Sequence, residues 1–414
     1  MKAKRLEVVS RYVAYNPEQD WLLPPSILDE LGEDHLAAFV HRLVERLDLS
    51  SFEAESSPEG RPGYPPQLLL KVWLYAYCLG VTSSRRLEQR IREDLGFRLL
   101  AGNLKPDHWT LNEFRRRHPR RLNDVFTQVV EVARQMGLGQ LGRVAIDSTR
   151  VAANASPDCS DTVEQLRRER VRIRRRVRRW QQECNRDDSD APGTRLEQRA
   201  QWQQRLEEIP RQLEQLRKSG QKRGSRTDPE SRYLRTRQGF CLGFTGEVAV
   251  ADDHLIVAQR VHQRTTDHGS AAEMTEAVVQ QCGERPAVIV ADSSYYNIEE
   301  IRKIEAAGSQ AIVPDPLLAR ELMGGPPAPT MNVRQQHRTP GLREHRERLR
   351  KQSACQHYRR RKALVEPIFG VLKQQRGIRQ FRCRGLVGVA TEWALATTAY
   401  NLTRIFTVGL KASH

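Results

Sequence analysis

A change in the spacing of apolar residues at Gly139 constrains the fold of this chain more than any other feature. Before this residue, apolar side chains recur every three or four positions, as they do along one face of an α-helix. After it come short apolar runs with β-branched residues, beginning with LGRVAIDSTRVAA, which are typical of buried strands. We therefore predict an all-helical N-terminal third followed by a mixed α/β region.

Several amphipathic stretches precede Gly139, and each of them predicts a helix. Thr110 and Glu113 form a capping box at the start of one helix, and Ser83 or Ser84 caps another. The segment 54–66 is rich in Gly and Pro and predicts a loop. The expected helices cover residues 25–47, 67–79, a stretch from 83 or 84, a stretch from 110, and 121–136.

Beyond Gly139, strand patterns alternate with helical patterns, which predicts a mixed α/β sheet. Three of the strands are expected to form a meander, with turns at Gly246 and at Asp252–Asp253. Residues 314–342 are rich in Pro and Gly and predict a loop or linker. The expected strands are 144–146, 240–244, 247–251, 255–262, 287–291 and 310–313, and the expected helices are 271–280, 297–306, 342–375 with a break near Ser353, and 385–406.

A long polar insertion, which we place at residues 158–226, follows the first strand. Nine of the 13 residues from Arg167 to Arg179 are arginine, and a break at 187–193 predicts two helices folded as a hairpin. Its apolar stripe is narrow. Two interpretations stay open for this hairpin, a solvated helical insertion and an arm that faces nucleic acid.

The formal net charge of +17 is unevenly distributed along the chain. Residues 334–384 contain 16 basic and 3 acidic side chains, and residues 156–226 contain 19 and 12, whereas residues 227–333 contain 9 and 15. A basic excess of this kind indicates an acidic partner, and nucleic acid is the first candidate. A generic arginine-rich soluble enzyme is the alternative.

Several classes of protein are excluded by other features of the sequence. The longest apolar run, Leu68–Val81, has 14 residues and contains Lys71, whereas a membrane-spanning helix needs about 20. The first 30 residues lack the apolar core and cleavage site of a signal peptide. The seven cysteines are scattered without a CxxC pair, which argues against a disulfide framework or a zinc finger. We expect a reducing, cytoplasmic compartment and no membrane partner.

Three carboxylates stand at informative positions in this pattern. Asp147 ends or nearly ends the strand at 144–146, Asp292 directly follows the strand at 287–291, and Glu366 lies in the basic helix. Acids at the carboxyl ends of sheet strands are placed to meet in one site, and a divalent metal relieves their mutual repulsion. Two such ions about 3.5–4 Å apart would clamp the attacking and leaving oxygens of a phosphodiester. Taken singly, each acid is more often an ordinary turn, cap or solvated residue.

The sequence around these acids resembles a known family. The segments AIDSTRVAANAS, VIVADSSYYN and RRRKALVEPIFGVLKQQRGIRQF are similar to the three acidic blocks of bacterial insertion-sequence DDE transposases, which have a ribonuclease-H-like catalytic domain. The segment YPPQLLLKVWLYAYCLGVTSSRRLEQRIRED resembles the helical domain that precedes many such catalytic domains. The resemblance covers most of residues 20–405 and is weakest over 156–226 and 314–350.

One subgroup of this family has a Tyr-x2-Arg-x3-Glu-x6-Lys signature in the third block. Glu366 and Lys373 match its last two positions. Lys362 stands at the Arg position, which preserves the charge. Arg359 stands at the Tyr position, with Tyr358 one residue early, and this departure leaves a tyrosine role without support.

The resemblance implies roles for these residues. Asp147, Asp292 and Glu366 would be the ligands of two Mg²⁺ ions, for which Mn²⁺ could substitute. Lys373 would act at the catalytic site by contacting a phosphate, and Lys362 lies on the same face of the expected helix. Each lysine is otherwise an ordinary surface residue.

Further residues are candidates for nucleic-acid contact. Tyr296 could stack on an unpaired base, with packing against the following helix as the alternative. Asp267 and His268 lie in a polar loop, where they either support the site or are merely solvated. The remaining candidates are Arg359 in the third block and Arg115, Arg116 and Arg117 in the helical region.

The resemblance also implies a domain organisation. We expect a helical DNA-binding domain over 1–138, a ribonuclease-H-like DDE catalytic domain over 139–405, the basic insertion at 158–226, and the linker at 314–342. The fold class is thus α/β, a mixed sheet with flanking helices, preceded by helices and interrupted by the hairpin.

The function that this resemblance implies is that of a DNA transposase, which cleaves phosphodiesters and transfers strands at the ends of an insertion sequence. Its partners would be double-stranded DNA, at terminal repeats and target, and a second copy of the chain, in a homodimer or larger assembly on DNA. A bacterial, nucleoid-associated location would follow. A metal-dependent nuclease without strand transfer and a catalytically silent DNA-binding repressor are the alternatives.

Overall fold

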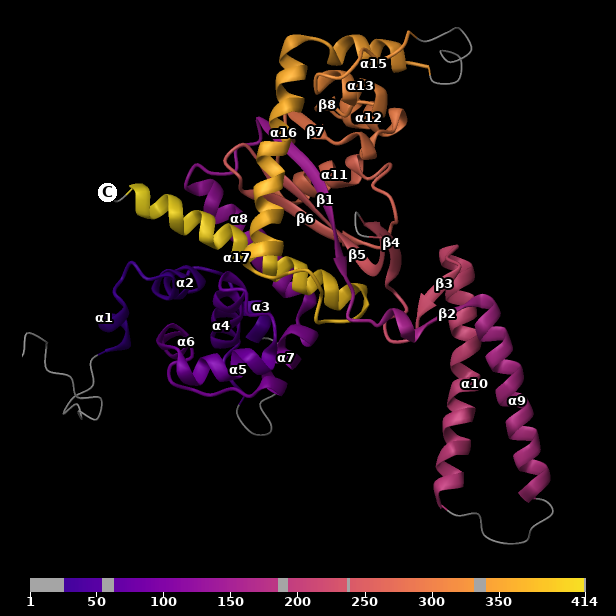
Figure 1. Cartoon of the computed structure of the whole chain (residues 1–414). Helices are drawn as coiled ribbons and strands as arrows, with labels where there is room; N and C mark the ends of the chain where they lie inside the picture. The colour runs from indigo at the N-terminus through magenta and orange to yellow at the C-terminus, as the bar shows by residue number, and fades with distance from the viewer. Residues whose placement is uncertain (1–25, 54–62, 185–192, 237–238, 331–339, 413–414) are drawn as a thin grey trace, which may run out of the picture.

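A six-stranded mixed sheet flanked by helices forms the centre of the computed structural model (Figure 1). The structure describes residues 26–53, 63–184, 193–236, 239–330 and 340–412. The predicted mixed α/β fold is therefore confirmed. The expected breaks at 54–62 and 187–192 lie outside the described residues.

Eight helices precede the sheet in the described part of the chain. Gly32, with a φ of 80°, ends the first of them, so the single helix expected over 25–47 is in fact two. The expected capping box at Thr110 is also wrong, because the side chain of Asp107 accepts a hydrogen bond from the Thr110 N–H and the helix begins at His108. The helices are α1 (Ile27–Leu31), α2 (Leu36–Val44), α3 (Ser50–Glu53), α4 (Pro66–Cys78), α5 (Ser84–Glu93), α6 (Leu95–Leu100), α7 (His108–Arg117) and α8 (Pro119–Gln135).

The sheet combines antiparallel and parallel pairings around its first strand. Its strands are β1 (Arg143–Ala152), β4 (Arg232–Thr236), β5 (Gly239–Ala251), β6 (Ile256–His262), β7 (Val288–Ala291) and β8 (Gln310–Ile312). Strand β5 pairs antiparallel with β1 on one side and with β4 and β6 on the other. Strands β7 and β8 extend the sheet in parallel from the free edge of β1.

The turn expected at Gly246 is absent, because β5 runs unbroken through this residue. Gly246 is required instead by close packing, since a Cβ at this position would lie 2.8 Å from the indole ring of Trp393. The neighbouring Glu247 points to the opposite face of the sheet, where its carboxylate accepts a hydrogen bond from the Ser270 hydroxyl. The expected meander therefore contains two strands in place of three, and β4, which pattern reasoning missed, completes this part of the sheet.

The helices that follow β6 cover both faces of the sheet. A short helix occurs within the expected loop at 314–342, because Asp315 caps it and Pro316 occupies its first turn. The break expected near Ser353 separates two helices. The elements are α11 (Ala271–Cys282), η2 (Ser293–Tyr295), α12 (Ile298–Ala306), α13 (Pro316–Leu322), α15 (Leu342–Leu349), α16 (Gln352–Gly370), the π-helical turn η3 (Val371–Gln375) and α17 (Gly385–Ala412).

The polar insertion forms a helical hairpin that projects from the rest of the molecule (Figure 1). It consists of α9 (Val163–Cys184) and α10 (Gly193–Ser219). A 3₁₀ turn, η1 (Pro157–Cys159), and a small antiparallel ladder of β2 (Ser160–Thr162) and β3 (Arg223–Ser225) form its base. The two helices pack through an apolar cluster of their own.

One continuous hydrophobic core joins the N-terminal helices to the sheet. Helix α17 lies between them, because it packs against α4 and α8 and also against β6. The domain boundaries drawn from the sequence therefore remain predictions. No helix among the described residues is long and apolar enough to cross a membrane.

Candidate functional site

The pairing of β1 with β7 places two aspartates side by side. Ile146 pairs with Ala291 in the parallel ladder, and Asp147 and Asp292 are the next residue of each strand segment. Strand β1 continues for five residues beyond Asp147, paired with β5, so this acid does not end its strand as expected. It lies where the parallel pairing with β7 stops, and the two carboxylates therefore flank the carboxyl edge of β7.

A buried arginine lies between these two carboxylates. The Nη1 atom of Arg361, on α16, is 3.2 Å from Oδ2 of Asp147, and its Nη2 atom is 3.7 Å from Oδ2 of Asp292. The Arg361 side chain is only 6% exposed, because α16 packs against both β1 and β7. One positive charge thus offsets two neighbouring negative charges.

The two aspartates differ in their surroundings. Burial raises the pKa of Asp147 to about 6, although Arg361 and the Ser148 N–H favour its charged form. Asp292 is 40% exposed, and its Oδ1 accepts hydrogen bonds from the backbone N–H and the hydroxyl of Ser293. The site is therefore more open to solvent at Asp292 than at Asp147, whose side chain is 23% exposed.

Glu366 does not take part in this contact. It is exposed on α16, and among the described residues it forms no hydrogen bond or ion pair. Five residues at about 100° each place it about 140° around the helix from Arg361. The structure therefore brings together two of the three predicted acids, Asp147 and Asp292. The third, Glu366, lies on a different face of α16 from Arg361.

Lys373 connects the end of this helix to β1. Its ammonium donates a hydrogen bond of 2.7 Å to the carbonyl oxygen of Arg150, three residues after Asp147. Burial lowers the pKa of Lys373. The residue lies in the π-helical turn η3, a rare conformation that is frequent at functional sites.

The other basic and aromatic candidates, Lys362, Arg359 and Tyr296, lie in three different environments. Lys362 is exposed, and among the described residues it has no hydrogen-bond or ion-pair partner. Arg359 donates from Nε to the carbonyl oxygen of Leu322. Tyr296 packs near the ring of His345, with 6.2 Å between the ring centroids, and burial raises its pKa to about 12.

The three candidate arginines of α7 do not share one environment. Arg115 is 3% exposed, its guanidinium stacks 3.8 Å from the centroid of the Trp73 ring, and it donates to the Tyr77 hydroxyl. Arg116 and Arg117 are exposed, and both pair with Glu113. Only these two arginines are accessible to a partner, so we leave Arg115 out of the candidate DNA contacts.

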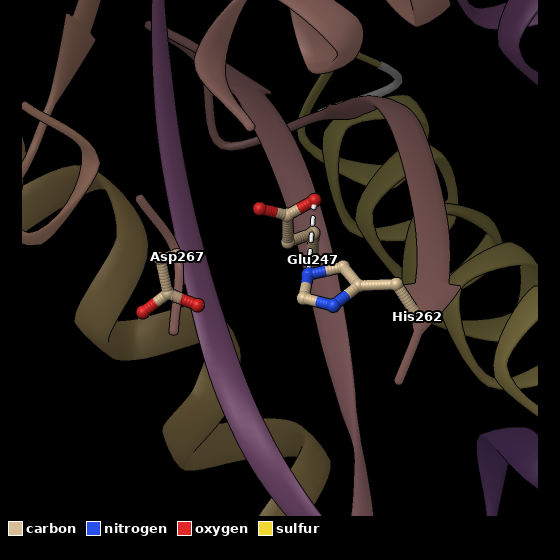
Figure 2. Close-up of side chains that lie close together, drawn as sticks. All are labelled: Glu247, His262 and Asp267. Atoms are coloured by element: carbon tan, nitrogen blue, oxygen red, sulfur yellow. Dashed lines mark ion pairs between the residues drawn. The ribbon is translucent and has the colours of Figure 1, made fainter. Parts of the chain in front are cut away.

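A second acidic group lies on the opposite face of the sheet. Glu247, His262 and Asp267 offer ligand atoms that all lie within 4.8 Å of one another (Figure 2). Asp267 is buried, which excludes the solvated loop considered for it, whereas His268 is exposed.

Arginines already neutralise this second group. Arg260 lies 2.5 Å from Glu247, and Arg150 donates two hydrogen bonds to Asp267. Although burial acts to raise the pKa of Glu247, the contacts with His262 and Arg260 lower it to about 2. With two carboxylates matched by two guanidinium groups, this group is better explained as a buried ion-pair network than as a metal site.

Sequence reasoning missed Arg361, Arg150 and Glu247. Arg361 stands within a run of four basic residues, and only its helical position relative to β1 and β7 distinguishes it from its neighbours. The turn expected at Gly246 places Glu247 at the end of a strand, whereas it lies within β5. The apolar residues on both sides of Glu247 were the available signal that its strand is buried.

Comparison with known proteins identifies two families. Residues 142–402 match the family model described as Transposase DDE domain, which covers more than half of the chain. Residues 25–117 match the model described as Transposase domain (DUF772). Neither the comparison with curated proteins nor that with solved structures produced a match.

Proposed function

The chain belongs to the DDE transposases of insertion sequences, and on that basis we propose that it cuts and joins DNA strands at the ends of its element by metal-dependent phosphodiester chemistry. The family makes it an enzyme of the polynucleotidyl transferase and endonuclease type that acts on DNA, and it implies dependence on a divalent metal. The metal chemistry, the ligands and the strand transfer are the parts that we propose.

The single observation that carries this proposal is the parallel register that sets Asp147 beside Asp292. The two carboxylates share one cation, Arg361, at a position open to solvent through Asp292. A cluster of carboxylate oxygens with water access is the donor set that Mg²⁺ prefers. When bound, two such ions would supply an activated water or 3′-hydroxyl and stabilise the leaving 3′-oxygen.

The residues around this donor set receive the following roles. Asp147 and Asp292 bind the metal, and Arg361 holds their charges balanced until the metal replaces it. We assign Glu366 as the third ligand on the family resemblance. Its side chain is exposed on α16, on a different face from Arg361, and is accessible to a metal ion bound from solvent.

We further propose that the basic residues near this edge position the DNA backbone. Lys373 is held against β1 through Arg150, so its charge lies on the strand that carries Asp147. Lys362 and Arg359 are exposed on α16. Phosphate oxygens are the natural partners of such groups, because the protein contributes mainly positioning and charge neutralisation to this reaction. Tyr296 is assigned a packing role.

The finer classification is also a proposal. An antiparallel set, β1, β5 and β6, followed by parallel β7 and β8 supports a ribonuclease-H-like domain over 139–405. The spacing from Glu366 to Lys373 supports the Tyr-Arg-Glu-Lys subgroup.

The eight helices before β1 support a DNA-binding domain over 1–138, in which Arg116 and Arg117 are accessible. On the family resemblance, we also propose that the chain acts as a homodimer or larger assembly on the DNA.

Strand transfer with a pre-cut element end tests this proposal. The substrate is a labelled duplex with the element end exposed as a 3′-hydroxyl, incubated with Mg²⁺ and a supercoiled target. We expect label to appear in the target with the wild-type chain and not with Asp147→Asn. Cleavage of an uncut end without any joined product would support a metal-dependent nuclease in place of a transposase, and DNA binding without either product would support a repressor.

A further inference from the structure

We propose that helix α9 is a DNA-binding arm whose exposed arginines contact the phosphate backbone of duplex DNA away from the cleavage site. This inference rests on the proposed function, because it takes the polyanion to be the DNA on which the enzyme acts. We define the arginine face of α9 as Arg167, Arg172, Arg174, Arg175, Arg176, Arg178 and Arg179.

The hairpin has the internal support that an extended arm needs. Leu166 and Ile173 of α9 are buried against Ile209 and Leu216 of α10. The two buried residues of α9, Leu166 and Ile173, are seven positions apart and so lie on the same face of the helix. Near the tip, the guanidinium of Arg199 stacks 4.6 Å from the centroid of the Trp180 ring. The arm is therefore a self-supporting element.

All seven side chains of the arginine face are exposed. Within the described residues none of them forms an ion pair or a hydrogen bond, although acids elsewhere on the hairpin are paired. Arg168, for example, pairs with Glu164, and Arg205 pairs with Glu169 and Asp161. A row of unpaired like charges repels itself, and it is stabilised when a partner brings regularly spaced negative charge.

The excess of positive charge is concentrated on α9, which has nine arginines against three glutamates, whereas α10 has six basic residues against four glutamates. Exposed positions on α10 are mainly glutamine and glutamate, including Gln201, Gln203, Gln204, Glu207 and Glu214. The hairpin therefore presents a cationic side and a nearly neutral side. This asymmetry fits a partner that lies along one flank of the arm, and it does not follow from a need for solubility alone.

The length of the arm suits a duplex. Helix α9 has 22 residues, which at 1.5 Å per residue gives about 33 Å. One turn of B-DNA is about 34–36 Å long. Arginine side chains along α9 can thus follow phosphates over about one helical turn. Figure 1 shows the hairpin extending away from the sheet, so this turn would lie beside the segment that is cut.

A charge-matched pair of variants tests the arm. The arm variant carries Arg174→Gln, Arg175→Gln and Arg178→Gln, and the control carries Arg211→Gln, Arg217→Gln and Lys218→Gln on α10, so both lose three positive charges. Affinity for a 40-base-pair duplex is measured by fluorescence anisotropy between about 50 and 300 mM salt. Circular dichroism and thermal denaturation confirm that both variants keep the hairpin folded.

We expect the arm variant alone to lose affinity, by about tenfold or more at low salt. Its slope of log K against log salt should decrease by up to about 3, because each lost phosphate contact removes about 0.9. Equal behaviour of the two variants would overturn the proposal, as would an arm variant with the wild-type slope. Binding of an acidic protein in place of DNA by the arginine face would overturn it as well.

The failure of this inference is distinguishable from the failure of the proposed function. Asp147→Asn should keep the wild-type salt slope and lose DNA cleavage. If the wild-type chain binds DNA through α9 but does not cut it with Mg²⁺, the arm stands and the proposed function fails. If the chain cuts DNA and the arm variant binds like the control, the proposed function stands and the inference about the arm fails.

Discussion

The guanidinium of Arg361 lies 3.2 Å from the carboxylate of Asp147. The same guanidinium reaches Asp292 at 3.7 Å. Arg361 therefore pairs with two carboxylates at once, and under the proposed function a metal ion would compete with it for them.

The first prediction concerns Arg361→Ala. Loss of the internal cation should lower the free energy of unfolding without metal by about 1–3 kcal/mol, because the partly buried carboxylate of Asp147 loses its charged partner while Asp292 stays solvated. It should also raise the affinity for Mn²⁺ or Ca²⁺ by about tenfold or more, since the ion no longer has to displace a positive charge. Urea denaturation and isothermal titration calorimetry measure the two effects.

The control for this prediction is Arg360→Ala. Arg360 is exposed, and among the described residues it has no hydrogen-bond or ion-pair partner, so its replacement should change neither quantity appreciably. Weaker metal binding by Arg361→Ala than by Arg360→Ala would show that Arg361 supports the metal site, which contradicts the account.

The second prediction separates Arg115 from its neighbour Arg116. Arg115→Ala should lower the free energy of unfolding by about 2–4 kcal/mol, because it removes a buried guanidinium that stacks on Trp73 and leaves the Tyr77 hydroxyl without its donor. Arg116→Ala removes an exposed ion pair with Glu113 and should cost about 0.5 kcal/mol or less. Urea denaturation compares the two, and equal effects would contradict the structural role of Arg115.

The third prediction concerns the pH dependence of stability through Glu247. Its pKa in the folded chain, about 2, lies below its ordinary value of 4.5. The stability that it contributes is therefore present above pH 4.5 and is lost as the pH falls toward 2. The difference in unfolding free energy between the wild-type chain and Glu247→Gln should be about 2 kcal/mol smaller at pH 3 than at pH 6. A difference that stays constant over this range would contradict the ion-pair network.

Much of the fold follows from local pattern. Helices α4 and α8 and strands β1 and β7 could be predicted because apolar periodicity and chain-breaking residues define them locally. The continuity of β5 could not, because Gly246 is explained only by Trp393, which is distant in sequence. Helix α13 was not predicted because the prolines around it indicate a loop, although Asp315 and Pro316 are a helix-start signal.

The candidate site could also be predicted only in part from the sequence. Asp147 and Asp292 could be proposed because each follows an apolar strand, and the strand register decides that they meet. Arg361 and Arg150 could not be distinguished from other arginines, because their roles depend on partners more than 100 residues away. The metal-ligand role of Glu366 rests on the family resemblance, and its exposed position on α16 agrees with the solvated residue that the local pattern alone allows.

The fourth prediction tests the central claim, that Asp147 and Asp292 form the metal-dependent catalytic site. The measurement is Mg²⁺-dependent cleavage of a labelled element-end duplex, with DNA binding recorded in the same samples. Asp147→Asn and Asp292→Asn should each reduce the cleavage rate by about 10²–10³-fold or more while binding DNA like the wild type, because each removes a ligand and not a DNA contact. Glu299→Gln, which alters an exposed acid of α12, should cut at the wild-type rate. Near-normal cleavage by either aspartate variant would contradict the account.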